Sequence, residues 1–121
     1  MNILHQLTNL ALYEVAKWAL PVLQKAPKDA LPSLIVTSTP TLHKEPVADL
    51  VSLSMVKSAQ RALTLSLHAK FGREVHIALM SVGGVVSPDA KGLSPENIAD
   101  RCWGLYQQPR EKWEREIEIW D

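Results

Sequence analysis

The feature that most constrains the fold is the alternation of compact apolar runs with longer stretches of helical periodicity. Residues 31–39 and 74–82 are rich in β-branched and aliphatic side chains, and each run has the length of a buried strand. Between them, apolar residues at helical spacing predict a helix from about Asp49 to Phe71, with Gly72 as its stop signal. Because a helix separates the two strands, the chain crosses over the sheet between them, which favours parallel pairing.

The rest of the chain continues the same alternation. Apolar residues at helical spacing predict a first helix over residues 3–23, and a final alternating segment predicts a strand over residues 113–120. A third helix is predicted from Ser94 to about Pro109, because serine can cap its first turn. The predicted order is α-β-α-β-α-β in a single domain of residues 1–121. We therefore expect an α/β fold in which helices pack on a three-stranded parallel sheet.

The first helix is apolar around most of its circumference. One face is made of Leu4, Leu7, Ala11, Val15, Trp18 and Val22, and a second apolar set is Leu10, Tyr13 and Leu20. A helix of this kind is buried on two sides or packs against a partner beyond the local core.

The composition excludes several classes of function. With 46% apolar and 21% charged residues, the chain has the make-up of a soluble globular domain. Its formal net charge is zero and its basic residues are scattered, so we expect no nucleic-acid partner. A single Cys102 excludes an internal disulfide, and the histidines show no metal-ligand spacing. Glu14 and Lys17 interrupt the apolar first helix, so we expect no membrane span, no signal peptide and a cytoplasmic location.

Several segments, spread over nearly the whole length, carry motif-like residues. They are Val36-Thr37-Ser38-Thr39, Leu53 to Lys57, Met80-Ser-Val-Gly-Gly-Val-Val, Ser94-Pro-Glu-Asn-Ile-Ala, and Asn9 with Leu20-Pro21. In order and spacing they resemble the C-terminal half of a short-chain dehydrogenase/reductase. The resemblance implies a truncated Rossmann-like domain. It also implies a homodimer or higher oligomer, with a four-helix bundle formed by the first two helices of each copy.

The departures from this family pattern affect its chemistry. Leu53 stands where the resemblance implies a tyrosine acting as general acid, and leucine cannot donate a proton. The glycine-rich turn that would cradle a cofactor pyrophosphate is absent from the sequence, and the Gly83-Gly84 pair alone is weak evidence for phosphate binding. Val82 replaces the proline of the late motif. We therefore expect no cofactor and no nicotinamide-dependent hydride transfer.

The candidate catalytic residues are Ser38, Thr39, His43 and Lys57, and each has a structural alternative. The two hydroxyls are predicted at a strand end, facing a crevice, although a bond to loop backbone explains them equally well. His43 is predicted in a loop over residues 40–49, where it is either a titrating catalyst or a solvated histidine. Lys57 is either a base in an apolar pocket or a lysine that is solvated or ion-paired with an acid such as Asp49 or Glu45.

A second group of residues is predicted to line an apolar ligand site. It consists of Leu53, Val82, Gly83 and Trp103. For Trp103, a place in the core or at an interface is the alternative.

Two classes of function follow. The first is a cofactor-independent enzyme of specialised metabolism, an isomerase, cyclase, dehydratase or pericyclic catalyst acting on a hydrophobic small molecule. The second is a non-catalytic pseudoenzyme that oligomerises with, or regulates, a full-length relative; a residual NAD(P)-dependent reductase and a product without a role are further alternatives. A closed pocket containing Thr39, His43 and Lys57 would favour the first class. A shallow crevice beside a large exposed helix face would favour the second.

Overall fold

The computed structural model describes residues 2–27, 29–45 and 47–121. In chain order its elements are α1 (Asn2–His5), the π-helical turn η1 (Gln6–Leu10), α2 (Ala11–Gln24), β1 (Ser33–Ser38), α3 (Pro40–Lys44), the 3₁₀ turn η2 (Ala48–Leu50), α4 (Val51–Phe71), β2 (His76–Val82), α5 (Pro95–Tyr106), the 3₁₀ turn η3 (Arg110–Lys112) and β3 (Glu116–Ile119). α1, η1 and α2 join end to end into one helical stretch, which corresponds to the predicted first helix.

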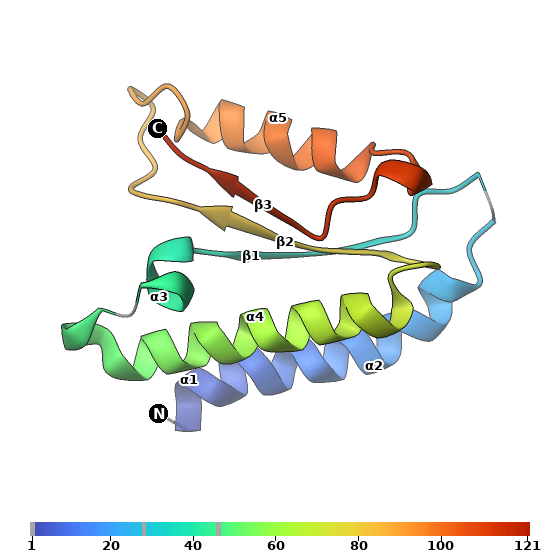
Figure 1. Ribbon diagram of the computed structural model, residues 1–121, viewed down its shortest axis with the longest axis horizontal. Coiled ribbons are helices and arrows are strands. Elements are labelled where there is room, and N and C mark those ends of the chain that lie inside the picture. Colours follow the sequence, from blue (N-terminus) through green and yellow to red (C-terminus); the bar gives the residue numbers. More distant parts are fainter. Residues whose placement is uncertain (1, 28, 46) are drawn as a thin grey trace.

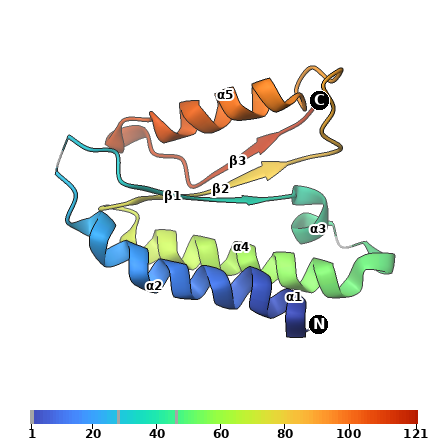
Figure 2. The ribbon, with the colours of Figure 1, turned by 180° about the vertical axis from the view of Figure 1, so that it is seen from behind.

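The three strands form one parallel sheet in the order β1-β2-β3. Figure 1 and Figure 2 show from opposite sides that α2 and α4 cover one face of this sheet, whereas α5 covers the other. β2 is the central strand, and every residue from His76 to Ser81 is buried. The predicted α/β fold with a three-stranded parallel sheet is therefore confirmed, and β1 and β3 are its edge strands.

The core consists of two apolar layers, one on each face of the sheet. The layer under α5 contains Ala78, Met80, Leu93, Leu105 and Ile119. The layer under α2 and α4 contains Ala16, Leu20, Val75 and Ile77. Alternate residues of β2 supply the two layers, as expected for a strand that is covered on both faces.

Only one side of the first helical stretch is buried. Asn9, Ala16 and Leu20 face the sheet and α4. The face predicted from Leu4 to Val22 is exposed, and the side chain of Trp18 is 73% exposed. Burial on two sides is thus not found among the described residues, so packing within this part of the chain does not account for the all-round apolar pattern.

The prediction that residues 40–49 form a loop is wrong, because this segment contains α3 and η2. Thr39 is extended, and Pro40 begins α3, where the fixed φ of proline suits the first turn of a helix. Pro40 and Leu42 are buried. These tertiary contacts hold a helix that is too short to be detected from periodicity.

The helix and the strand predicted in the C-terminal third are present, but both are shorter than predicted. The Ser94 Oγ accepts a hydrogen bond from the Asn97 backbone N–H at 3.2 Å, so the predicted cap of α5 is confirmed. β3 begins at Glu116 rather than Trp113, whose ring instead stacks on buried His76 with 5.0 Å between centroids. In the described part of the chain, no helix has the combination of length and apolar character that crossing a membrane requires.

Candidate functional site

Strand alternation places two hydroxyl groups on the sheet face that α4 covers. Ser38 follows Leu34 by four residues along β1, and Ser81 follows Ile77 by four along β2, so each points to the same face as its apolar predecessor. The two serines are partners in the strand register. Both hydroxyls are buried and neither has a hydrogen-bond partner among the described residues. At the carboxyl ends of β1 and β2, this face of the sheet therefore carries two buried hydroxyl groups.

His43 belongs to α3, and its side chain is buried rather than solvated in a loop. Its side chain has 0% exposure, and its Nε2 lies 3.8 Å from the Glu116 Oε1. Neither ring nitrogen has a hydrogen-bond partner in the described part of the chain. Burial lowers the pKa of His43, and the charge of Arg61 lowers it further, against the opposing effect of Glu116. The imidazole is thus neutral at neutral pH and closed off from solvent.

Arg61 and Glu116 form the strongest ion pair of the site. The Arg61 Nε and Nη2 donate to the two carboxylate oxygens of Glu116, both at 2.9 Å, in a bidentate arrangement. The Glu116 side chain is 16% exposed and that of Arg61 34%. The hydrogen bonds from Arg61 lower the pKa of Glu116, so this carboxylate stays ionised. Lys44 of α3 also pairs with Glu118 of β3, through one hydrogen bond from its Nζ to the Glu118 Oε1.

We call His43, Lys44, Arg61, Glu116 and Glu118 the charged cluster. It ties α3 and α4 to the edge strand β3 through two ion pairs. Arg61, Glu116 and Glu118 were not singled out from the sequence. The available signals were an arginine one turn after Lys57 on the same helix face and glutamates at alternate positions of the last strand.

Lys57 is engaged by its own helix. Its Nζ donates to the Oε1 of buried Gln60 at 3.2 Å, and burial lowers its pKa. Within the described residues it forms no ion pair with Asp49 or Glu45. Leu53, one turn earlier, instead lines a shallow surface cleft with Leu4 and Leu50 near the start of α4, so no proton donor stands beside Lys57 at that position.

Asn9 is a buried polar residue. In the sequence it was one of the motif-like residues, with no role assigned to it. It lies in η1, and its Nδ2 donates to the backbone carbonyl of Val56 at 3.2 Å and contacts the His5 Nδ1 at 3.1 Å. This contact fixes η1 against α4 one residue before Lys57. The polar Asn9 between apolar residues of the predicted first helix was the signal for it.

The residues predicted to line a ligand site are not brought together. Val82 packs against the core layer under α5. Trp103 is on the outer side of α5, 59% exposed, and contacts the ring of Tyr106. A Cβ added to Gly83 would lie 2.3 Å from a carbon of the Trp120 ring, so this glycine serves close packing.

The hydroxyl of Thr39 is paired with a neighbouring side chain. Its Oγ1 lies 3.0 Å from the Thr41 Oγ1. Ser38, Thr39, His43 and Lys57 do not line any of five prominent surface clefts on the described part of the chain. The cleft beside the charged cluster, of about 480 Å³, is lined by the ion-paired Lys44, Glu116 and Glu118 together with two neighbours on the approach to β3. The His43 ring and the Ser38 hydroxyl are thus enclosed, whereas Thr39 and Lys57 are partly exposed.

Metal binding has no evident ligand set. In residues 2–27, 29–45 and 47–121, no group of three or more His, Cys, Asp and Glu side chains is arranged to hold a metal ion. The charged cluster contains a histidine and two glutamates, but Arg61 and Lys44 already neutralise the two carboxylates.

The fold is that of part of a short-chain dehydrogenase. It is similar to the crystal structure of a short-chain dehydrogenase from Rhodopseudomonas palustris, with a TM-score of 0.66 and 22% sequence identity. The similarity covers 90% of this chain and 44% of that protein, so the chain spans less than half of its length. The resemblance predicted from the motif residues is thus confirmed at the level of the fold. Comparison of the sequence with protein-family models gave no match, and neither did comparison with curated proteins.

Acidification is expected to destabilise the protein through His43. Because its pKa in the folded chain is below the ordinary value, its contribution to stability is complete above about pH 6.5 and is lost as the pH falls through the folded value. Urea unfolding at pH 7.5 and 5.5 measures this loss, at most about 1.4 kcal/mol per pH unit for one proton. The variant His43→Met should show a smaller loss. An unchanged pH dependence in that variant would contradict the assignment to His43, since His76 titrates in both proteins.

Proposed function

We propose that this chain is a non-catalytic protein that acts by association, and that its partner is a second copy of the same chain. The contact surface is the outer helix face, which we define as the exposed side chains of the α1–α2 stretch and of α4. The observation that carries the proposal is the composition of this face. It is apolar or small over most of its length, although it lies opposite the core.

On α4, the exposed side of the helix has no charged residue over five turns. The exposed residues from Val51 onward are Val51, Met55, Ser58, Ala59, Ala62, Ser66 and Ala69, and the next exposed residue is Lys70. A helix whose outer side faces water normally carries charged and polar groups there. Small side chains instead allow a second helix to pack at short distance. This pattern supports the proposal that a partner covers the exposed side of α4.

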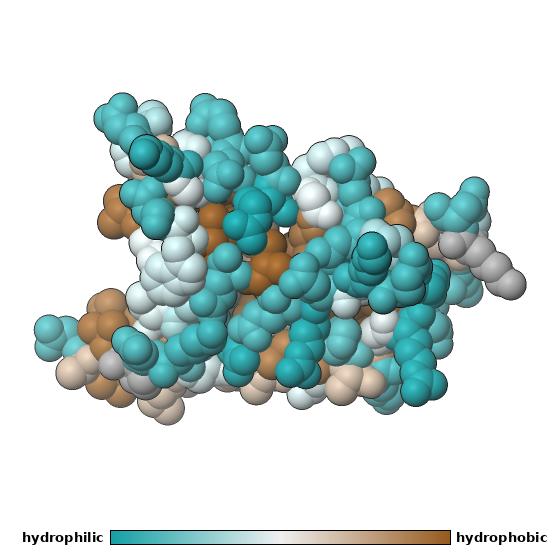
Figure 3. Space-filling model, turned by 45° about the horizontal axis from the view of Figure 1, so that its top comes forward, coloured by the Kyte–Doolittle hydropathy of each residue, from teal (hydrophilic) through white to brown (hydrophobic). Residues whose placement is uncertain are grey.

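The α1–α2 stretch adds larger apolar groups to the same face. The side chain of Leu7 is 71% exposed, and those of Trp18 and Val22 are also largely exposed. Contiguous exposed apolar surface is uncommon on monomers, and tryptophan is frequent among residues that dominate binding energy. Figure 3, which brings the α5 side forward, shows many hydrophilic side chains, with apolar groups in a central hollow and at the left edge. Self-association about a twofold axis would cover the apolar face in both copies.

The rival hypothesis of a cofactor-independent enzyme needs a cleft that reaches the candidate catalytic groups. His43 is enclosed, Lys57 is bonded to Gln60, and Leu53 supplies no proton. These features favour the non-catalytic alternative. The resemblance to short-chain dehydrogenases supports the same surface, because it implies a dimer contact through the corresponding helices. The free, partly buried Cys102 fits the reducing conditions of the cytoplasm, where we propose that the protein acts.

Titration calorimetry with NADPH and then NADH tests whether the chain retains the nicotinamide site of a residual reductase. We expect no saturable heat in the micromolar range, because Leu53 replaces the acid and the sequence lacks a glycine-rich phosphate loop. A full-length short-chain dehydrogenase titrated under the same conditions is the positive control. Saturable micromolar binding would contradict the proposal and would mean that the assembled protein has a cofactor site.

A further inference from the structure

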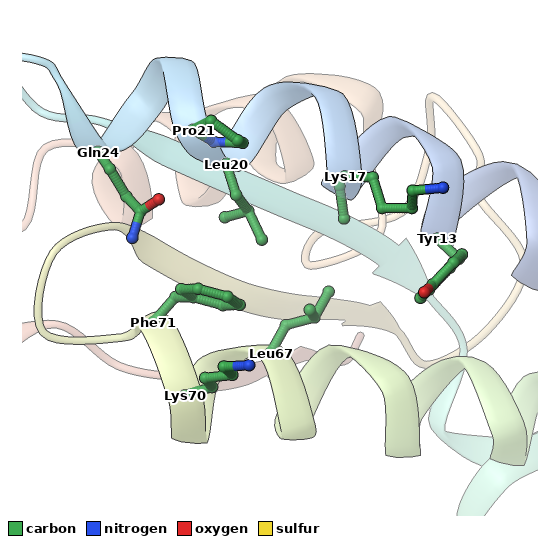
Figure 4. Close-up of a pocket in the computed structure, with 9 residues that line it drawn as sticks. Tyr13, Lys17, Leu20, Pro21, Gln24, Leu67, Lys70 and Phe71 are labelled. Atoms are coloured by element: carbon green, nitrogen blue, oxygen red, sulfur yellow. The ribbon is translucent and has the colours of Figure 1, made fainter.

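A groove with an apolar floor runs between α2 and α4 on the side away from the sheet. It has a volume of about 380 Å³. Figure 4 shows Leu20 projecting from α2 toward α4, and Leu67 and Phe71 projecting from α4 toward α2. Ala16, which is nearly fully buried, adds a small residue to the lining. The volume is within the range of small-molecule sites, about 300–1,000 Å³.

The charged side chains that line this groove are all basic. They are Lys17 on α2 and Lys70 on α4. Lys17 has a partner, Glu14, at 3.4 Å, but both side chains are more than half exposed, so this pair is weak. Lys70 forms no ion pair among the described residues, and its Nζ lies 5.4 Å from the centre of the Phe71 ring. The groove thus combines apolar walls with an uncompensated positive charge at its rim.

We propose that this groove binds an aliphatic carboxylate, a fatty acid of medium chain length. Its carboxylate would pair with Lys70, and its alkyl chain would lie along Leu67, Leu20 and Ala16 toward Tyr13. The lining residues of α2 extend from Tyr13 to Gln24, which corresponds to roughly 16 Å along the helix and accommodates an extended chain of this kind. A neutral amphiphile would use the apolar walls but not Lys70. A short carboxylate would use Lys70 but not the walls.

Binding of sodium dodecanoate, at concentrations below its self-association, tests the proposal by calorimetry. We expect saturable binding, about tenfold weaker binding of dodecanol, and no measurable binding of acetate. The variant Lys70→Gln should bind dodecanoate about tenfold more weakly. Lys91→Gln makes the same change of net charge at an exposed position outside the groove, and its affinity should equal that of the unmodified chain.

Binding in the groove does not require self-association, although the exposed groove residues Tyr13, Lys17 and Lys70 belong to the outer helix face. The titration is therefore repeated on the Ala62→Glu variant, which is designed to be monomeric and leaves the groove lining intact. Methyl NMR spectra of Leu20 and Leu67 provide a second readout. Shifts of these methyls in either protein support the site. Absence of saturable binding in both proteins, equal losses in Lys70→Gln and Lys91→Gln, equally tight binding of dodecanol, or shifts confined to other residues would overturn it.

Discussion

Replacing Arg61 with methionine is expected to lower the free energy of unfolding by about 2 kcal/mol. The change removes both hydrogen bonds to Glu116 and leaves a mostly buried carboxylate without a partner. Breaking a fully buried ion pair costs about 3–5 kcal/mol, and the 34% exposure of Arg61 reduces this cost. Urea unfolding at pH 7 measures the difference. His43 is packed against the same carboxylate, so the loss should be accompanied by loosening of α3.

Two further variants separate the ion pair from general effects of substitution. Lys17→Met removes an exposed ion pair with Glu14 and should change the stability by less than about 0.5 kcal/mol. The double variant Arg61→Met/Glu116→Leu removes both charges and should recover to within about 1 kcal/mol of the unmodified chain. If Arg61→Met were no more destabilised than Lys17→Met, the charged cluster would not hold α3 and α4 to β3.

Replacing Ala62 with glutamate is expected to weaken self-association by at least about a hundredfold. Ala62 lies at the centre of the uncharged side of α4, and a twofold contact would bring two glutamates into one apolar interface without cationic partners. Glutamate is a good helix former, so the monomer should keep its helical circular dichroism. Native mass spectrometry at a fixed protein concentration measures the distribution of species.

Ala99→Glu is the matched control for this substitution. Ala99 is an exposed alanine in the middle of α5, on the opposite face of the sheet, so the same charge is added to a helix that we do not expect to be covered. The distribution of species should be that of the unmodified chain. Equal oligomeric states for Ala62→Glu and Ala99→Glu would show that the outer helix face is not the contact surface.

The order of the elements could be predicted from the sequence because each signal is local. The apolar run 74–82 and the helical period that ends at Gly72 mark β2 and α4 to within a few residues. α3 could not be predicted, since Pro40 and Leu42 are held by contacts with distant parts of the chain. The burial of His43 could not be predicted for the same reason, because His43 was expected in a loop and lies in α3.

The candidate site could be predicted only in part, because its strongest contacts join residues far apart in the sequence. Arg61 and Glu116 are separated by 55 positions, and no spacing rule connects them. The sequence indicated that the first helix is apolar all round. It did not indicate which side of this helix faces the core. That choice depends on small Ala16, which allows α2 to lie close to the sheet, whereas Trp18 points away.

Sedimentation equilibrium of the unmodified chain over the micromolar range is the most direct test of the proposed function. We expect a mass of two chains, or a larger even multiple, because the uncharged side of α4 and the exposed Trp18 need a partner. A single-chain mass at every concentration would contradict it and would leave the outer helix face exposed to solvent in the isolated protein.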